Sequence, residues 1–295
     1  MRIEQRGLQA LDAVIQTQSF ASAAKQLFIT QPAVTLRIKQ LETQFGQPLL
    51  IREKPYKATA LGEKLLGLLR RTRLLEDHFL QEIQHELPGR LSIALNRDSL
   101  ETWFIQVLDK LNLLEKINID IVTDDQEITI DYFRQGSVST CISSYEKALP
   151  GCECILLGHM DYLLVATPDF INRNFKNKKT IAENLVRAPV IIFDSRDRLP
   201  EQFFTHFFKK TFKLGHYHKV PSVQGYKQFA LNGYGYGLMP RLDIINELAK
   251  GDLVEICPDK RWLMPLYLHY WQLPAHQYQR FIEIIIQEAQ QILII

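Results

Sequence analysis

The chain lacks the features that mark a secreted or membrane-bound protein. Its 295 residues include only four cysteines, too few for a disulfide framework in a chain of this length. It has no run of about 18 apolar residues, the length that a membrane-spanning helix needs. The first residues are charged at Arg2 and Glu4 and lack the apolar core of a signal peptide. We therefore expect a cytoplasmic protein with no membrane partner.

Signatures of catalysis and cofactor binding are also missing. Neither Gly-x-Ser-x-Gly nor His-Glu-x-x-His occurs. Residues 152–154 (Cys-Glu-Cys) and 216–218 (His-Tyr-His) have a spacing that sometimes binds metal, but neither has a second pair at zinc-site distance. Residues 233–240 alternate glycine with tyrosine without the full dinucleotide fingerprint, which favours a structural turn with Gly235 or Gly237 at positive φ. We expect no cofactor, no metal and no enzymatic activity.

The most informative segment is residues 19–42, which predicts two short helices joined by a tight turn. Ser19 can cap the first helix and Thr30 the second, and Pro32 falls in the first turn, where its missing N–H costs little. Apolar residues then recur at helical spacing and predict a core-facing side, namely Val34, Ile38 and Leu41. The opposite side carries groups that hydrogen-bond base edges. Our candidates for a DNA groove are Thr30, Gln31, Pro32, Thr35, Leu36 and Arg37.

Residues 44–59 predict a turn, a short strand, a basic loop and a return, which together form a wing. The candidates for phosphate contacts are Lys39, Arg52 and Lys57. Residues 1–90 hold thirteen Lys and Arg against nine Asp and Glu, a balance of +4, whereas the whole chain is +2. A basic module on a slightly acidic body is typical of a DNA-binding head. The alternative is a packed helix pair that binds no nucleic acid.

A long helix is predicted over residues 61–86. Six positions recur at intervals of four and three, the pattern of a coiled-coil seam, and five of them are apolar: Leu61, Leu65, Leu68, Thr72, Leu75 and Phe79. The helix could pack on its own domain, but we favour pairing with a second subunit, since a two-fold dimer can bind two half-sites of one operator. Pro88 and Gly89 end the helix and mark a domain boundary.

From Arg90 onward, short apolar strands alternate with helices, which predicts α/β units around a largely parallel sheet. The expected strands are residues 91–95, 117–122, 138–142, 162–166 and 190–193. The expected helices are residues 99–114, 128–135 and 202–212. Sheets of this kind bind ligands beyond the carboxyl ends of their strands.

Polar residues follow these predicted strands and are our candidates for a ligand cleft. They are Asn96, Asp98, Ser99, Asp124, Ser143, Ser144 and Asp194. The helix that opens near Ser99 offers free N–H groups to a carboxylate, and Asp124 could pair with an ammonium or guanidinium group. Asp98 and Ser99 could instead only cap that helix, and Asp124 and Asp125 could be exposed loop acids.

Residues 23–52 contain the pattern Ala-Ala-x-x-Leu-x-Ile-Thr-Gln-Pro-Ala-Val-Thr, followed by Leu-Glu, Gly, Leu-Leu and Arg. This pattern resembles the winged helix-turn-helix of the LysR-type transcriptional regulators, with Thr35 where the family usually has Ser. The resemblance implies a DNA-binding head at 1–58, a linker and dimerisation helix at 59–88 and an effector domain at 89–295. It also implies two α/β lobes like those of periplasmic binding proteins, lobe 1 at about 89–165 and 266–295 and lobe 2 at about 166–265.

Further segments, among them residues 8–15, 98–103 and 188–190, resemble the ArgP-like branch, which responds to lysine and arginine. The resemblance implies a regulator of amino-acid transport or metabolism genes. Its expected partners are double-stranded operator DNA, lysine or arginine as effector, a homodimer or homotetramer, and RNA polymerase. Two alternatives remain open: an architectural DNA-binding protein without an effector, and a cytoplasmic solute-binding protein.

Overall fold

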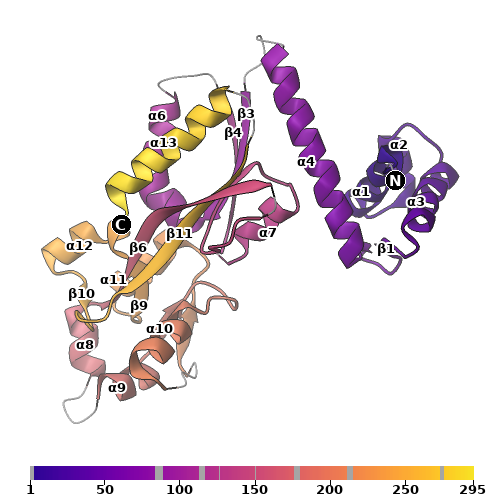
Figure 1. The fold of residues 1–295 in the computed structure, drawn as a ribbon. Coiled ribbons are helices and arrows are strands. Elements are labelled where there is room, and N and C mark those ends of the chain that lie inside the picture. The colour runs from indigo at the N-terminus through magenta and orange to yellow at the C-terminus, as the bar shows by residue number, and fades with distance from the viewer. Residues whose placement is uncertain are drawn as a thin grey trace.

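The computed structural model describes residues 3–83, 89–112, 117–125, 127–149, 151–175, 180–210, 215–272 and 276–295. A small helical head, a long helix and a larger mixed domain follow one another along the chain (Figure 1). Within these residues, no helix is both long and apolar enough to cross a bilayer.

The head consists of three helices and a two-stranded wing: α1 (Gln5–Thr17), α2 (Phe20–Gln26), α3 (Gln31–Phe45), β1 (Leu50–Ile51) and β2 (Lys57–Ala58). As predicted, the side chain of Ser19 caps α2 and that of Thr30 caps α3. Gly46 ends α3 in the left-handed region at φ +69°, where a residue without Cβ is favoured. The strands pair antiparallel, Leu50 with Ala58 and Ile51 with Lys57.

Helix α4 (Ala60–Ile83) connects the head to the rest of the chain, and predicted helical residues 84–86 lie outside the described residues. Its first turns join the apolar core of the head through Leu65, Leu66 and Leu69. Asp12 of α1 is buried and accepts hydrogen bonds from Arg70 Nη2 at 3.3 Å and Arg73 Nη1 at 2.8 Å. These charge-assisted bonds attach α4 to the head.

The C-terminal domain is built on a seven-stranded sheet in the order β10-β6-β11-β5-β3-β4, with β9 paired to β6. Its strands are β3 (Gly89–Asn96), β4 (Ile117–Asp124), β5 (Thr140–Ser143), β6 (Cys152–Ala166), β9 (Gly237–Pro240), β10 (Val254–Glu255) and β11 (Trp262–Trp271). A separate parallel pair is formed by β7 (Val190–Ile192) and β8 (Tyr217–Lys219).

The expectation of a largely parallel sheet is wrong. Strand β3 pairs parallel with β4 and β5, but β6 and β11 pair antiparallel with each other and with all their other neighbours. The pairing of β6 with β11 extends from Tyr162 and Trp262 to Cys152 and Trp271. These two long strands therefore run through both lobes, with β3, β4 and β5 at one end and β9 and β10 at the other.

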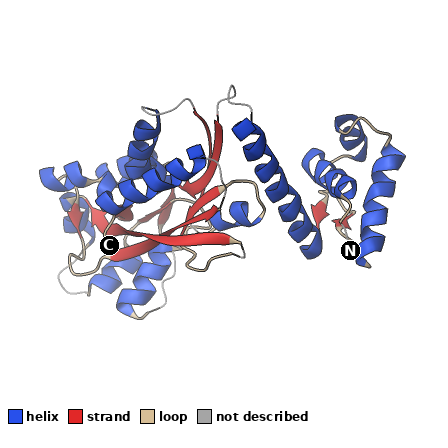
Figure 2. Ribbon diagram, turned by 45° about the horizontal axis from the view of Figure 1, so that its top comes forward, coloured by secondary structure: helices blue, strands red, loops and turns tan. Residues whose placement is uncertain are grey.

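Helices cover both faces of the sheet (Figures 1 and 2). They are α5 (Arg97–Ser99), a π-helical turn η1 (Leu100–Phe104), α6 (Ile105–Asn112), α7 (Thr129–Arg134) and α13 (His276–Ile292) in lobe 1, and α8 (Pro168–Asn174), α9 (Ile181–Arg187), α10 (Leu199–Phe208), α11 (Val223–Leu231), η2 (Arg241–Asp243) and α12 (Ile245–Lys250) in lobe 2. Because side chains alternate along a strand, Ile93 and Leu95 of β3 face the α6 and α13 side, whereas Ala94 packs with α7.

Helix α4 also packs against the end of α7. Arg70 Nη1 donates a hydrogen bond to the carbonyl of Gln135 at 3.3 Å, and the Arg71 guanidinium lies 5.2 Å from the Trp271 ring centre. The backbones approach closely, since a Cβ on Gly136 would lie 2.9 Å from Arg70 Cβ and one on Gly67 would lie 3.0 Å from a carbonyl oxygen of α7. The head is thus linked to lobe 1 through α4.

Candidate functional site

Helix α3 presents a polar edge to solvent. Val34, Ile38 and Leu41 are buried against the head, so the opposite side of the helix remains available. Of the residues predicted for a DNA groove, Thr30, Gln31, Pro32 and Leu36 are exposed and Thr35 and Arg37 are half-buried. The Thr30 hydroxyl accepts from the Ala33 N–H at 3.4 Å, and the Thr35 hydroxyl donates to the Gln31 carbonyl at 3.3 Å. The Thr30 hydroxyl therefore caps the helix, whereas the Thr35 hydroxyl bonds to the helix backbone one turn earlier.

The wing and the end of α3 add basic side chains to this edge. Lys39, Arg52 and Lys57, the candidates for phosphate contacts, are all exposed. Arg52 Nη2 also lies 3.2 Å from Glu42 Oε2, while Glu42 Oε1 accepts the backbone N–H groups of Leu49 and Leu50. Glu42 thus holds the first wing strand against α3 and positions the Arg52 guanidinium beside the helix.

A second site is a cleft between the two lobes, with about 800 Å³ of open space including its mouth. Six aspartates line the cleft: Asp98, Asp124, Asp125, Asp194, Asp197 and Asp243. Arg97 and Lys227 are the cations among the described lining residues. The cleft is therefore acidic and suits a ligand that carries positive charge.

The structure brings four of the predicted cleft residues together: Asn96, Asp98, Asp124 and Asp194 all line it. Ser99 lies next to them, fully buried, and its hydroxyl has no hydrogen-bond partner within the described part of the chain. The buried amide of Asn96 is likewise without a partner among those residues.

Ser143 and Ser144, which were also predicted for the cleft, are not among its described lining residues. Strand β5 lies between β3 and β11, and the Ser143 hydroxyl accepts the Tyr145 N–H at 3.2 Å. The Ser143 side chain therefore stabilises the turn that follows β5.

Asp98 has an unusual environment. The Tyr162 hydroxyl donates to Asp98 Oδ2 at 2.6 Å. Loss of hydration raises the pKa of Asp98 to about 6, the Tyr162 hydrogen bond opposes that rise, and the negative charges of Asp243, Asp197 and Glu101 add to it. This carboxyl group therefore titrates near neutral pH, where the approach of a cation would ionise it fully.

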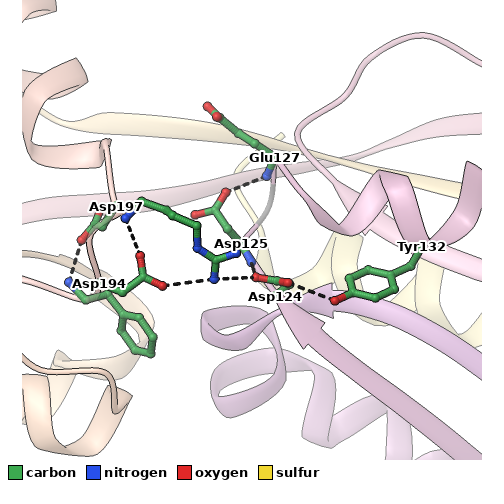
Figure 3. A network of polar contacts seen from close by, with 8 residues as sticks. Asp124, Asp125, Glu127, Tyr132, Asp194 and Asp197 are labelled. Atoms are coloured by element: carbon green, nitrogen blue, oxygen red, sulfur yellow. Dashed lines mark hydrogen bonds and ion pairs between the residues drawn. The ribbon is translucent and has the colours of Figure 1, made fainter. Parts of the chain in front are cut away.

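Arg196 does not line the cleft, but its guanidinium group contacts two lining aspartates, one from each lobe (Figure 3). Arg196 Nη2 lies 3.3 Å from Asp124 Oδ1, at the end of β4, and 3.2 Å from Asp194 Oδ2, after β7. Asp124 also accepts the Tyr132 hydroxyl at 3.1 Å. Although burial alone would raise the pKa of Asp194, hydrogen bonds from the backbone and side chain of Arg196 lower it.

Sequence reasoning missed several of these residues. The Arg97 guanidinium lies 4.8 Å from the Phe193 ring centre and Lys227 Nζ lies 3.1 Å from Asp243 Oδ1, so both contacts join segments far apart in the chain. Asp197 accepts the N–H groups of Phe193 and Leu199 and thereby shapes its loop. The acidic and basic run at residues 194–198 was the available signal for this loop.

A DNA-reading head joined to a two-lobed small-molecule cleft defines a ligand-responsive DNA-binding protein. The family model for the bacterial regulatory helix-turn-helix protein, lysR family, matches residues 5–63, and that for the LysR substrate binding domain matches residues 84–290. The chain belongs to the LysR family. It is a DNA-binding transcriptional regulator modulated by a small effector, and its relatives are named regulators rather than enzymes.

The chain is similar to the HTH-type transcriptional regulator ArgP of Photobacterium profundum, with 41% identity over 99% of this chain and 98% of that protein. The crystal structure of ArgP from Mycobacterium tuberculosis is similar at 33% identity and a TM-score of 0.85, covering 98% of each chain. Full-length LysG from Corynebacterium glutamicum with bound effector Arg is similar at 27% identity and a TM-score of 0.80, covering 99% of this chain and 100% of that one.

Proposed function

We propose that the effector of this regulator is a basic amino acid, lysine or arginine, bound in the cleft between the lobes. The observation that carries the proposal is the lining itself, in which six aspartates outnumber the lining cations Arg97 and Lys227 even when Arg196, which contacts two of them, is added. Such an amino acid carries two cations and one carboxylate. The similar LysG structure, which holds arginine as effector, supports the same ligand class.

The two ends of the ligand fit different parts of the cleft. Asp124 and Asp194 face each other from opposite lobes and suit the side-chain cation, whereas Asp98 suits the α-ammonium group. The α-carboxylate needs donors, and Arg97 together with the unpartnered amide of Asn96 supplies them on the lobe 1 side. Contacts to both lobes allow the ligand to stabilise one lobe arrangement over another.

The same proposal covers the DNA side. Helix α3 enters the major groove of an operator, Lys39, Arg52 and Lys57 contact phosphates, and two subunits bind two half-sites. Exposed apolar residues of α4 support pairing with a second copy, namely Leu68, Leu75, Phe79 and Leu80.

The regulator acts in the cytoplasm, as a homodimer or homotetramer working with RNA polymerase, on genes of amino-acid transport or metabolism. Its domains divide near residues 58 and 88.

Isothermal titration calorimetry tests the effector. We expect lysine or arginine to bind the wild-type protein, and Asp124→Asn to weaken that binding at least tenfold, because removing one partner of a charge pair costs about 2–5 kcal/mol. The matched control is Asp131→Asn, which removes an exposed carboxylate paired with Arg134 on α7, outside the cleft.

Two results would contradict the proposal at different levels. Unchanged affinity in Asp124→Asn would remove that residue from the ligand site. Absence of binding heat with both amino acids would refute the effector class, while a gel shift on the protein's own upstream DNA would still test the DNA-binding role.

A further inference from the structure

The loop of residues 193–199 carries a cation to the point where the two lobes meet. One nitrogen of Arg196 contacts Asp124 from lobe 1 and Asp194 from lobe 2, at 3.3 and 3.2 Å. These two contacts place the guanidinium between the carboxylates of Asp124 and Asp194, both of which are labelled in Figure 3. A ligand cation that is to pair with both carboxylates must reach this same position.

The three groups differ in their contact with water. The Arg196 side chain is 54% exposed, whereas those of Asp124 and Asp194 are 13% and 28% exposed. Arg196 can therefore turn toward solvent at little cost in hydration, while the carboxylates stay in the cleft. Tyr132 and the Asp125 N–H hold Asp124 in place by hydrogen bonds of 3.1 and 2.9 Å.

The backbone of this loop keeps the guanidinium close by. Asp194 Oδ1 accepts the Arg196 N–H at 2.7 Å, and Asp197 accepts the N–H groups of Phe193 and Leu199. A cation attached to a fixed loop competes at a high effective concentration, because it never diffuses away.

We propose that Arg196 is a tethered competitor of the effector's side-chain cation and thereby sets the affinity and selectivity of the cleft. A ligand with a cationic side chain displaces the guanidinium from Asp124 and Asp194. A ligand with an uncharged side chain cannot replace the positive charge that Arg196 supplies to these carboxylates. Such a ligand therefore does not displace Arg196 and does not bind. The inference rests on the proposed basic amino-acid effector.

Arg196 could have the opposite role, that of a latch that closes the two lobes on the ligand. This role would depend on the same contacts with Asp124 and Asp194. Other links between the lobes do not involve Arg196, since Gln202 Nε2 donates to Glu127 Oε1 at 3.1 Å and Arg97 lies over Phe193. Contacts between the lobes therefore do not depend on Arg196 alone, which favours the competitor role over that of a latch.

The test is calorimetric titration of lysine and arginine into the full-length wild type, Arg196→Ala, Arg196→Lys and Arg198→Ala. Arg198 is the matched control, because it is exposed, lies two residues along, and pairs with Glu201 at 3.8 Å outside the cleft. We expect Arg196→Ala to bind both amino acids about three- to tenfold more tightly, in keeping with the loss of an exposed competing ion pair. Arg196→Lys should remain near the wild type and Arg198→Ala should match it.

The outcomes separate the two hypotheses. If the wild type binds and Arg196→Ala binds equally or more weakly, Arg196 is not a competitor, and a weaker affinity identifies it as a latch. If neither lysine nor arginine binds the wild type, the proposed effector class fails and the competitor role fails with it. An unchanged melting temperature of Arg196→Ala would show that the variant is folded.

Discussion

Asp98 shows how one carboxyl group can respond to both ligand and pH. Its pKa of about 6 arises mainly because burial removes water from the group, with further repulsion from neighbouring acids. The unfolded chain ionises the same group near its ordinary value of 3.8. Asp98 therefore favours the folded state most at low pH, and this contribution is lost as the pH rises through about 6. A cation beside Asp98 would offset that loss.

We expect effector binding to release protons near pH 6. The α-ammonium group lowers the pKa of Asp98, so protons leave on binding, and affinity falls as the pH drops from 7.5 to 5.5. Calorimetry at pH 6 in two buffers of different ionisation enthalpy measures the release. Asp98→Asn should show none, and equal heats for the wild type in both buffers would place the ammonium group elsewhere.

The contact between α4 and α7 shows how two helices can connect the head to the cleft. The carbonyl of Gln135, just after α7, accepts from Arg70 of α4, whose other nitrogen binds the buried Asp12 of the head. From within α7, Tyr132 donates to Asp124 in the cleft. Gly136 makes the close approach possible, because its φ of +67° and missing side chain leave room for Arg70.

Gly136→Ala should disturb this contact more than an ordinary glycine substitution does. The added Cβ would meet Arg70 Cβ at 2.9 Å and Arg71 N at 3.2 Å. The control is Gly251→Ala, which has a similar φ of +78° with nothing within 4 Å. Both should lose about 1 kcal/mol from the strained φ, and Gly136→Ala a further 1–3 kcal/mol from overpacking.

Thermal unfolding and small-angle X-ray scattering measure these effects. The extra cost at Gly136 would appear either as a lower Tm than that of Gly251→Ala or as a larger radius of gyration, if α4 moves away from α7. Identical values of both quantities for the two variants would mean that α4 and α7 are not in contact in solution.

At the scale of the whole molecule, the head and the cleft carry opposite charge. Lys39, Arg52 and Lys57 of the head are exposed, while the six aspartates line a cleft in the C-terminal domain. The head and the C-terminal domain lie on opposite sides of α4 in Figure 1. This separation suits a protein that binds a polyanion at one end and a small cation at the other. The separation also keeps the effector's charge away from the phosphate contacts. A change caused by effector binding must therefore reach the head through the structure that lies between the cleft and the head.

Lys57→Ala should weaken binding to all DNA sequences alike. Losing one phosphate contact per subunit should reduce the slope of log K against log salt concentration by about 0.9 for each subunit bound. Fluorescence anisotropy with specific and scrambled operators over a salt series measures this slope. Lys147→Ala, an exposed lysine of the C-terminal domain, is the control. A loss confined to the specific operator would show that Lys57 reads bases.

The sequence by itself determined the elements whose interactions are local. The caps at Ser19 and Thr30, the buried face of α3 and the start of α4 follow from neighbours within four residues, so their patterns could be read directly. Residues at the ends of β3 and β4 were also predictable, because the carboxyl ends of these parallel strands lie at a common edge, whereas Asp194 follows β7 of the separate β7–β8 pair. Asn96, Asp98, Asp124 and Asp194 accordingly line one cleft.

Only the tertiary structure decided which groups meet across the lobes. Arg196 and Asp124 are separated by 72 positions, and Asp243 enters the cleft from η2, a short helix that no local pattern distinguishes. The expectation of positive φ at Gly235 or Gly237 was wrong for the same reason, since Gly233 takes that role at +69°. Gly237 is needed because a Cβ would lie 2.6 Å from the Tyr226 ring. Close packing between distant segments depends on the whole fold, so it cannot be predicted from the spacing of residues along the sequence.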